Sequence, residues 1–267
     1  MYHLKERAGV MLRELVVARL TREQAKHARR RFIDETTQFE EGGVERRESP
    51  RISRERSAAP RISRERSAAP RISRERSAAP RISRERSAAP RISLSHGRLL
   101  RALRAVDRPT FSLTVPHVLR LHGLLMRTKQ GGVLRAGPCH TTGLGGRPVS
   151  YHPANHVLPA LTRLLERTNR HLAGHPPFDV AGELLARFLE IHPFADGNGR
   201  VARLLVYWVL RRSFCWWPRG VALSLVSGRV GNRRYIQALA RFQGGREDEI
   251  GLFVLKQAHI VFCCCCC

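Results

Sequence analysis

The stretch that decides the fold runs from His192 to Arg200 and reads HPFADGNGR. Pro193 disfavours a helical backbone for the residue before it, so a helix arriving from the N-terminal side should end near His192. Gly197 and Gly199 allow a tight turn, and we expect a second helix to begin at about Arg200. The stretch therefore predicts two helices joined by a glycine-containing loop, with the imidazole at the end of the first helix.

The same loop combines three kinds of chemical group. Amides at the start of a helix have no partner inside it and, with the helix dipole, favour a bound phosphate, to which Asn198 and Arg200 add side-chain donors. Asp196 is a lone carboxylate beside that position, which suits Mg²⁺ because this ion takes further oxygens from phosphate and water. His192 can accept a proton from a hydroxyl, a contribution of about 10²–10⁴-fold in rate. Together these groups indicate phosphoryl or nucleotidyl transfer to an alcohol.

Turn chemistry alone explains any single residue of this loop, because Gly, Asn and Asp are common between helices and a solitary histidine is usually structural. The whole set is different. Its fixed positions would arise by chance on the order of once in 10¹⁰ windows.

Outward from the stretch, the chain is helical on both sides. A Gly- and Pro-rich segment, CHTTGLGGRPVSYHPA from Cys139 to Ala154, contains a short alternating run and predicts a hairpin or an irregular loop. The globular part, residues 99–262, is long enough for one hydrophobic core. The spacing of apolar residues predicts helices over 11–41, 115–126, 157–170, 180–191, 201–212, 233–242 and 249–262.

The part before residue 99 divides by composition. Residues 1–43 are an N-terminal helical segment that ends at Gly42-Gly43. Residues 44–98 contain four identical copies of RISRERSAAP, each with one isoleucine, one proline and a cluster of charges. Such a unit cannot bury enough apolar surface to offset the entropy of ordering, so we expect a disordered Arg/Ser/Pro-rich linker. Residues 263–267 are a poly-Cys tail.

The chain of 267 residues is strongly basic, with 48 Lys and Arg, 22 Asp and Glu and a formal net charge of +26. This charge favours polyanions at low salt, but no RNA-binding aromatic motif accompanies it, so nucleic acid is not the expected partner. Cys139 and Cys215 lack CxxC spacing, which argues against a zinc module or a disulfide framework. No run has the length of a signal peptide or a transmembrane segment, so we expect a cytoplasmic protein, with a nuclear location as the alternative.

The run from His192 to Arg200, followed by Arg203, matches the pattern HPFx(D/E)GNGRxxR without exception, and the chain therefore resembles the Fic family. The resemblance covers about Leu113 to Phe262. It implies an all-α fold, a Fic-type helical bundle with a short β-hairpin flap over residues 141–151, here beside the disordered repeat segment. Further points of agreement are His122, Tyr151-His152-Pro153 and Tyr235.

The resemblance implies transfer of AMP from Mg-ATP to a Ser, Thr or Tyr hydroxyl of a target protein. His192 would be the general base and Asp196 the magnesium ligand. The flap would add the target segment as an extra strand. Gly199 separates the chain from the Doc-like branch, which phosphorylates its target and has lysine there. The residues implied to hold ATP are Gly197, Asn198, Gly199, Arg200, Arg203, Tyr235 and Gln243, of which Arg203 would bind the γ-phosphate and the last two the adenine.

The resemblance also implies autoinhibition, a brake on ATP binding, because many Fic proteins carry an inhibitory helix with the pattern (S/T)xxxE(G/N). Its glutamate pairs with the second arginine of the motif and displaces the γ-phosphate. Residues 37–42, TQFEEG, fit the pattern with Glu41, and a shift by one residue selects Glu40. Either carboxylate could form a bidentate pair with Arg203. The alternative is a solvated helix end.

Other functions stay open. The same site could remove AMP from a modified protein, or transfer another phosphoryl or nucleotidyl group. A different class is a non-catalytic basic protein whose repeats bind RNA, acidic proteins or anionic lipid. The expected partner is a protein with an acceptor hydroxyl, and a homodimer is a further alternative.

Overall fold

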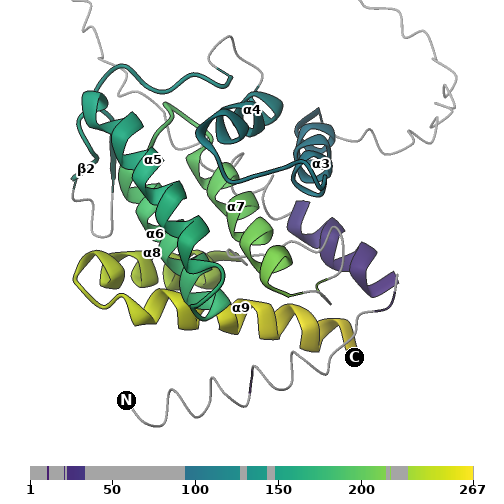
Figure 1. Cartoon of the computed structure of the whole chain (residues 1–267). Coiled ribbons are helices and arrows are strands. Elements are labelled where there is room, and N and C mark those ends of the chain that lie inside the picture. The colour runs from purple at the N-terminus through teal and green to yellow at the C-terminus, as the bar shows by residue number, and fades with distance from the viewer. Residues whose placement is uncertain are drawn as a thin grey trace, which may run out of the picture.

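The computed structural model describes residues 11, 21, 23–33, 94–126, 131–142, 148–214, 217 and 228–266, and this part is mostly helical (Figure 1). The hairpin pairs β1 (His140–Thr142) with β2 (Pro148–Ser150) in antiparallel fashion. These elements confirm the all-α class with a short β-hairpin. The labelled helices are α3 (Leu94–Val106), α4 (Val115–Leu125), α5 (Ala154–His171), α6 (Pro177–Ile191), α7 (Asn198–Ser213), α8 (Gly228–Gln243) and α9 (Asp248–Cys266).

The expected helices from residue 115 onward are all present, with ends that differ by a few residues. The start of one expected helix and the end of the expected linker differ for physical reasons. α7 begins at Asn198 rather than at about Arg200, because Gly197 already takes the left-handed conformation of its N-cap. α3 begins at Leu94, inside the range 44–98 expected to be linker, because a helix nucleated by the buried Leu99 and Leu103 extends cheaply by one turn.

The core is centred on α6 and α7, which lie between the other helices (Figure 1). Residues 201–210 of α7 are buried without interruption, as expected for a helix that is surrounded on all sides. α6 crosses α9 so closely that a methyl group added at Gly182 would lie 2.7 Å from the backbone nitrogen of Gly251. Because α6 ends at the predicted site, this crossing helps to place the site.

The N-terminal segment contributes to the same core. Residues 23–33 are helical, and Ala28, Phe32 and Ile33 are buried, which agrees with part of the helix expected over 11–41. Glu40, Glu41 and the four repeats lie outside the described residues. Within the described part of the chain, none of the helices combines the length and the hydropathy that a membrane span requires.

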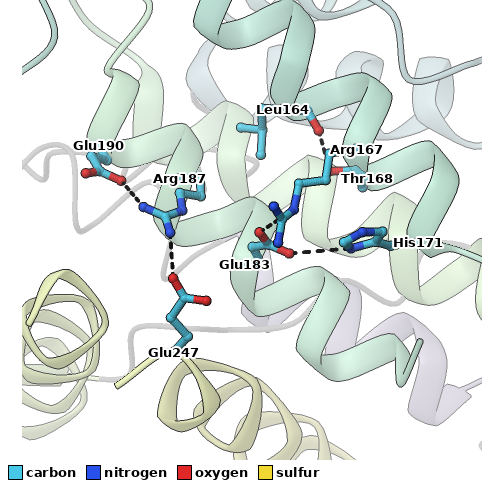
Figure 2. A network of polar contacts seen from close by, with 8 residues as sticks. All are labelled: Leu164, Arg167, Thr168, His171, Glu183, Arg187, Glu190 and Glu247. Carbon is cyan, nitrogen blue, oxygen red and sulfur yellow. Dashed lines mark hydrogen bonds and ion pairs between the residues drawn. The ribbon is translucent and has the colours of Figure 1, made fainter. Parts of the chain in front are cut away.

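A network of ion pairs ties α6 to its neighbours (Figure 2). Glu183 of α6 contacts Arg167 of α5 at 2.8 Å, and Arg187 of α6 contacts Glu247, in the turn between α8 and α9, at 2.6 Å. Arg187 also lies over the ring of Phe242 at 4.8 Å. Half-exposed pairs of this kind each contribute about 0–1 kcal/mol, so the network orients α6 more than it stabilises the fold.

Candidate active site

His192 is the C-cap of α6, as the proline after it predicts. Its backbone is left-handed, with φ 51° and ψ 61°, and its amide donates to the carbonyl of Phe188 at 3.0 Å. Among the described residues it is the one non-glycine residue with positive φ. This conformation costs about 1–2 kcal/mol for a residue with a side chain, so neighbouring contacts must hold it in place.

The imidazole of His192 is prepared to accept a proton. Its ring stacks on the ring of Tyr151, which follows β2, with centroids 3.9 Å apart. Nδ1 lies 3.4 Å from the carbonyl of Leu189; since a carbonyl only accepts, Nδ1 carries the proton and Nε2 the free lone pair. Burial lowers the pKa of His192 from its ordinary value, and the charge of Arg135 acts in the same direction. The neutral form therefore dominates at neutral pH.

The loop after His192 leads into the N-terminus of α7, whose amides favour an anion. The N-cap, Gly197, has φ 80° and supplies no side-chain cap, and the first turn contains no acidic residue. The amides of Asn198 and Gly199 belong to the first turn of the helix, where amides have no partner inside it. A methyl group at Gly197 would lie 2.9 Å from the sulfur of Met126, so this position accepts only glycine without rearrangement.

The side chain of Asn198 has a structural role in the loop instead of the expected role in phosphate binding. The buried amide donates from Nδ2 to the carbonyl of Phe194 at 2.7 Å, and its Oδ1 accepts from the amide of Phe194 at 2.9 Å. The prediction of Asn198 as a side-chain donor to phosphate is therefore corrected: both ends of this side chain bind the loop. Its contribution is the shape of the loop, together with its backbone amide.

Asp196 is suited to hold a metal ion that arrives with phosphate. Its side chain is 69% exposed; Oδ1 accepts from the amide of Gly197 at 2.6 Å, and Oδ2 lies 3.4 Å from Nη2 of Arg200. No group of three or more His, Cys, Asp or Glu residues in the described ranges could form a metal cage. A single exposed carboxylate fits Mg²⁺, which completes its shell with phosphate and water oxygens.

The structure groups some of the predicted residues and separates others. His192, Asp196, Gly197, Asn198, Gly199 and Arg200 share one loop and helix start. Arg203 lies on the same helix and is buried, with 2% of its surface exposed. Tyr235 is buried on α8 against Phe253, whereas Gln243 is exposed about 12 Å further along that helix.

Two residues not assigned a role from sequence support the loop. His122 of α4 donates from Nε2 to the carbonyl of Asp196 at 3.0 Å and accepts at Nδ1 from the amide of Gly132 at 2.9 Å. Its ring stacks on Phe194 at 3.7 Å. Arg135 donates to the carbonyl of His192 at 2.7 Å. In the sequence, each of these residues stands out only as a polar residue among apolar neighbours. That pattern does not show which distant backbone group the residue binds.

Comparison with known proteins agrees with this geometry. Residues 112–210 match the Fic/DOC family. A Fido domain-containing protein of Dictyostelium discoideum is 35% identical over 92 residues, which are 32% of this chain and 59% of that protein. The chain thus spans less than two thirds of this curated relative.

Solved structures share the fold. A Fic family protein from Desulfovibrio desulfuricans is 24% identical, with a TM-score of 0.54, over 65% of this chain and 53% of that chain. A Fic domain-containing signaling protein from Bacteroides thetaiotaomicron is 22% identical, with a TM-score of 0.53, over 64% and 68% of the two chains. Fic/Fido proteins generally transfer nucleotides or other groups to proteins. The motif, the loop geometry and the family match agree that residues 112–210 form a Fic-type domain, similar to the Fic/DOC family.

Proposed function

We propose that this protein transfers AMP from Mg-ATP to a Ser, Thr or Tyr hydroxyl of a target protein. The observation that carries the proposal is the arrangement of one short loop. A neutral imidazole ends α6, and the uncapped, glycine-preceded start of α7 follows six residues later. The loop thus offers a proton acceptor and an anion site side by side.

The chain's own groups would act as follows. Nε2 of His192 accepts the hydroxyl proton while the hydroxyl oxygen forms a bond to the α-phosphorus, and the bond from that phosphorus to the pyrophosphate leaving group breaks. The first-turn amides of α7 and the guanidinium of Arg200 stabilise the phosphate charge. Asp196 would hold Mg²⁺, which when bound neutralises charge on the phosphate oxygens.

The hairpin would receive the target. Its two strands are three residues long and pair with each other from His140–Ser150 to Thr142–Pro148. An outer strand edge can accept an extended segment by backbone hydrogen bonds, which makes recognition depend little on the target's side chains. Tyr151, directly after β2, lies against His192 and so brings that edge close to the base.

The decisive experiment uses ATP labelled at either end of the phosphate chain. Full-length protein is incubated with a cell lysate, Mg²⁺ and ATP labelled at the α- or the γ-phosphorus. AMP transfer predicts protein-bound label from the α position alone, and mass spectrometry should find AMP on a hydroxyl side chain. H192A should abolish the label.

Other outcomes of this experiment reject the proposal. Label from the γ position would indicate phosphorylation. Equal labelling by wild type and H192A would assign the activity to another site. The last outcome is no label at all from the variant E40G/E41G, although calorimetry shows that it binds Mg-ATP. This outcome would exclude transferase activity with ATP.

The brake is part of the proposal. We propose that Glu40 or Glu41, which lie outside the described residues, pairs with Arg203 and keeps the γ-phosphate out. The double variant E40G/E41G should incorporate more label than wild type because Arg203 becomes available to ATP. E166A is the matched control, since Glu166 is an exposed glutamate of α5. Equal incorporation by all three proteins would reject the brake.

A further inference from the structure

Arg135, in the segment between α4 and β1, is a buried arginine whose side chain donates to four backbone carbonyls. Only 8% of its surface is exposed. Nε donates to His192 at 2.7 Å, Nη1 to Gly137 at 2.8 Å, and Nη2 to Ile191 at 3.2 Å and to His152. A planar fork of five N–H donors is the one side-chain group that can serve several carbonyls in this way.

These carbonyls belong to two separate parts of the structure. Ile191 and His192 end α6, where carbonyls have no partner in the helix and carry the negative end of its dipole. Gly137 lies just before β1 and His152 just after β2. One guanidinium therefore joins the base of the hairpin to the end of α6.

The backbone of Arg135 strengthens the same junction. Its amide donates to the carbonyl of Pro193 at 3.0 Å, directly after His192. Side chain and main chain together bind three consecutive carbonyls, from Ile191 to Pro193. Such contacts can hold His192 in its left-handed conformation, which is otherwise costly.

We propose that Arg135 is a positioning residue that couples the hairpin to His192, so that an acceptor hydroxyl held on the hairpin meets the base in one geometry. This inference rests on the proposed transfer to a hydroxyl. Misplacement by about 1 Å can lower a rate about 10²-fold, so a link between the two parts would matter for chemistry more than for ATP binding.

The charge of Arg135 has a second, separable effect. Two charged groups, Arg135 and Asp196, act on the His192 ring. The ring of Tyr151 stacks on it, and the carbonyl of Leu189 accepts from its Nδ1. The Arg135 charge lowers the pKa of His192, whereas the Asp196 charge raises it. Lysine at position 135 would keep the charge but lose the fork, and methionine would lose both.

The test compares R135K and R135M with wild type, using the full chain. R163M is the matched control, since Arg163 is exposed on α5. Calorimetry should show ATP affinity unchanged in all of them. Single-turnover AMP transfer should fall about 10²-fold in both Arg135 variants and stay unchanged in R163M. The pKa of His192, followed by NMR, should rise in R135M alone.

Hydrogen exchange tests the coupling itself. The amides of the hairpin and of His192 should exchange faster together in R135K, while those of α9 stay protected. Exchange and transfer rates equal to wild type in R135K would overturn the proposal. If both variants unfold, hydrogen exchange is measured instead in wild type at increasing denaturant concentrations. The proposal would be overturned if the hairpin amides and the His192 amide became exposed in separate steps.

The two proposals fail in different ways. If wild type transfers no AMP, the proposed function is wrong, yet the exchange pattern and the His192 titration still show whether Arg135 links the two parts. If wild type transfers AMP and R135K does so at the same rate, only the role of Arg135 is rejected.

Discussion

At the scale of single residues, His192 owes its chemistry to its neighbours more than to its own side chain. Burial lowers its pKa, the Leu189 carbonyl selects the tautomer, and Tyr151 covers one face of the ring. A base in this position is neutral and oriented before any substrate binds.

This environment predicts the pH dependence of the proposed AMP transfer. Protonated imidazole cannot accept a proton, so the rate should rise with pH through the pKa of His192 and level off above it. Because burial lowers that pKa, the midpoint should lie below the ordinary value of 6.5. Single-turnover rates across a pH series check this; a midpoint above 6.5 would contradict the assignment of His192 as a buried base.

His122 predicts a pH-dependent contribution to stability. Burial lowers its pKa, so the unfolded chain binds a proton more readily, and stability is present above pH 6.5 and lost as the pH falls through the folded value. H122A should lower the free energy of unfolding at neutral pH by about 1–3 kcal/mol, because the Gly132 amide and the Asp196 carbonyl lose their partner.

Urea unfolding of wild type and H122A at several pH values measures this effect. The difference between them should narrow as the pH falls below 6.5, because only wild type loses the contribution of His122. His192 titrates in both proteins and cancels in the comparison. A difference that widens toward acid pH would refute the interpretation of His122 as a neutral, hydrogen-bonded group.

At the scale of elements, the crossing of α6 and α9 fixes the position in space of the helix that carries His192. Gly182 and Gly251 let the two backbones approach, and Asp179 of α6 also packs against Gly251. The atoms nearest to a methyl group added at Gly182 are all backbone atoms of α9, so no side chain can rotate away there. The fold thus uses two glycines to seat the helix that presents His192.

G182A should therefore destabilise the protein. The added methyl would lie 2.7 Å from the backbone of α9, and overpacking of this kind typically costs about 1–3 kcal/mol. G97A is the matched control: Gly97 lies inside α3 with nothing within 4 Å of an added methyl, so it should stabilise α3 by about 0.5–1 kcal/mol. Thermal unfolding of the two variants compares them; equal melting temperatures would contradict the tight crossing.

At the scale of the whole molecule, the charge of +26 acts separately from the active site. Long-range attraction of polyanions depends on the sum of charges, whereas the proposed transfer would depend on a few groups in one loop. Polyanion binding should therefore change with salt concentration, and group transfer with substitutions in the loop. This difference distinguishes a transferase from a basic binding protein.

The affinity for a polyanion should depend on the salt concentration and should not depend on His192. Fluorescence anisotropy with single-stranded poly-U RNA should give an affinity that falls steeply as salt rises, with the same slope for wild type and H192A. Labelled transfer by H192A should meanwhile be absent. A change in RNA affinity on replacing His192 would place the polyanion at the loop and contradict this separation.

The sequence by itself determined the local geometry of the site. Pro193 after His192 and the glycines beyond it act through steric limits on their own backbone and that of their neighbours. The end of α6, the loop and the start of α7 were therefore predictable within three residues. The hairpin was also expected, from the turn residues of 139–154. The regular apolar spacing of α4 to α9 also predicted these helices, because residues three and four positions apart share one face of a helix that can be buried.

Only the tertiary structure decided which distant groups complete the site. Arg135 reaches a carbonyl 57 residues away, and His122 reaches one 74 residues away. Neither pairing has a local pattern, because both depend on how α4, the hairpin and α6 pack. Asn198 shows the converse: its place in the motif was clear, but its side-chain partners, the two backbone groups of Phe194, became known only from the folded loop. Hydrogen bonds between distant residues follow from packing, which backbone preferences of neighbouring residues do not encode.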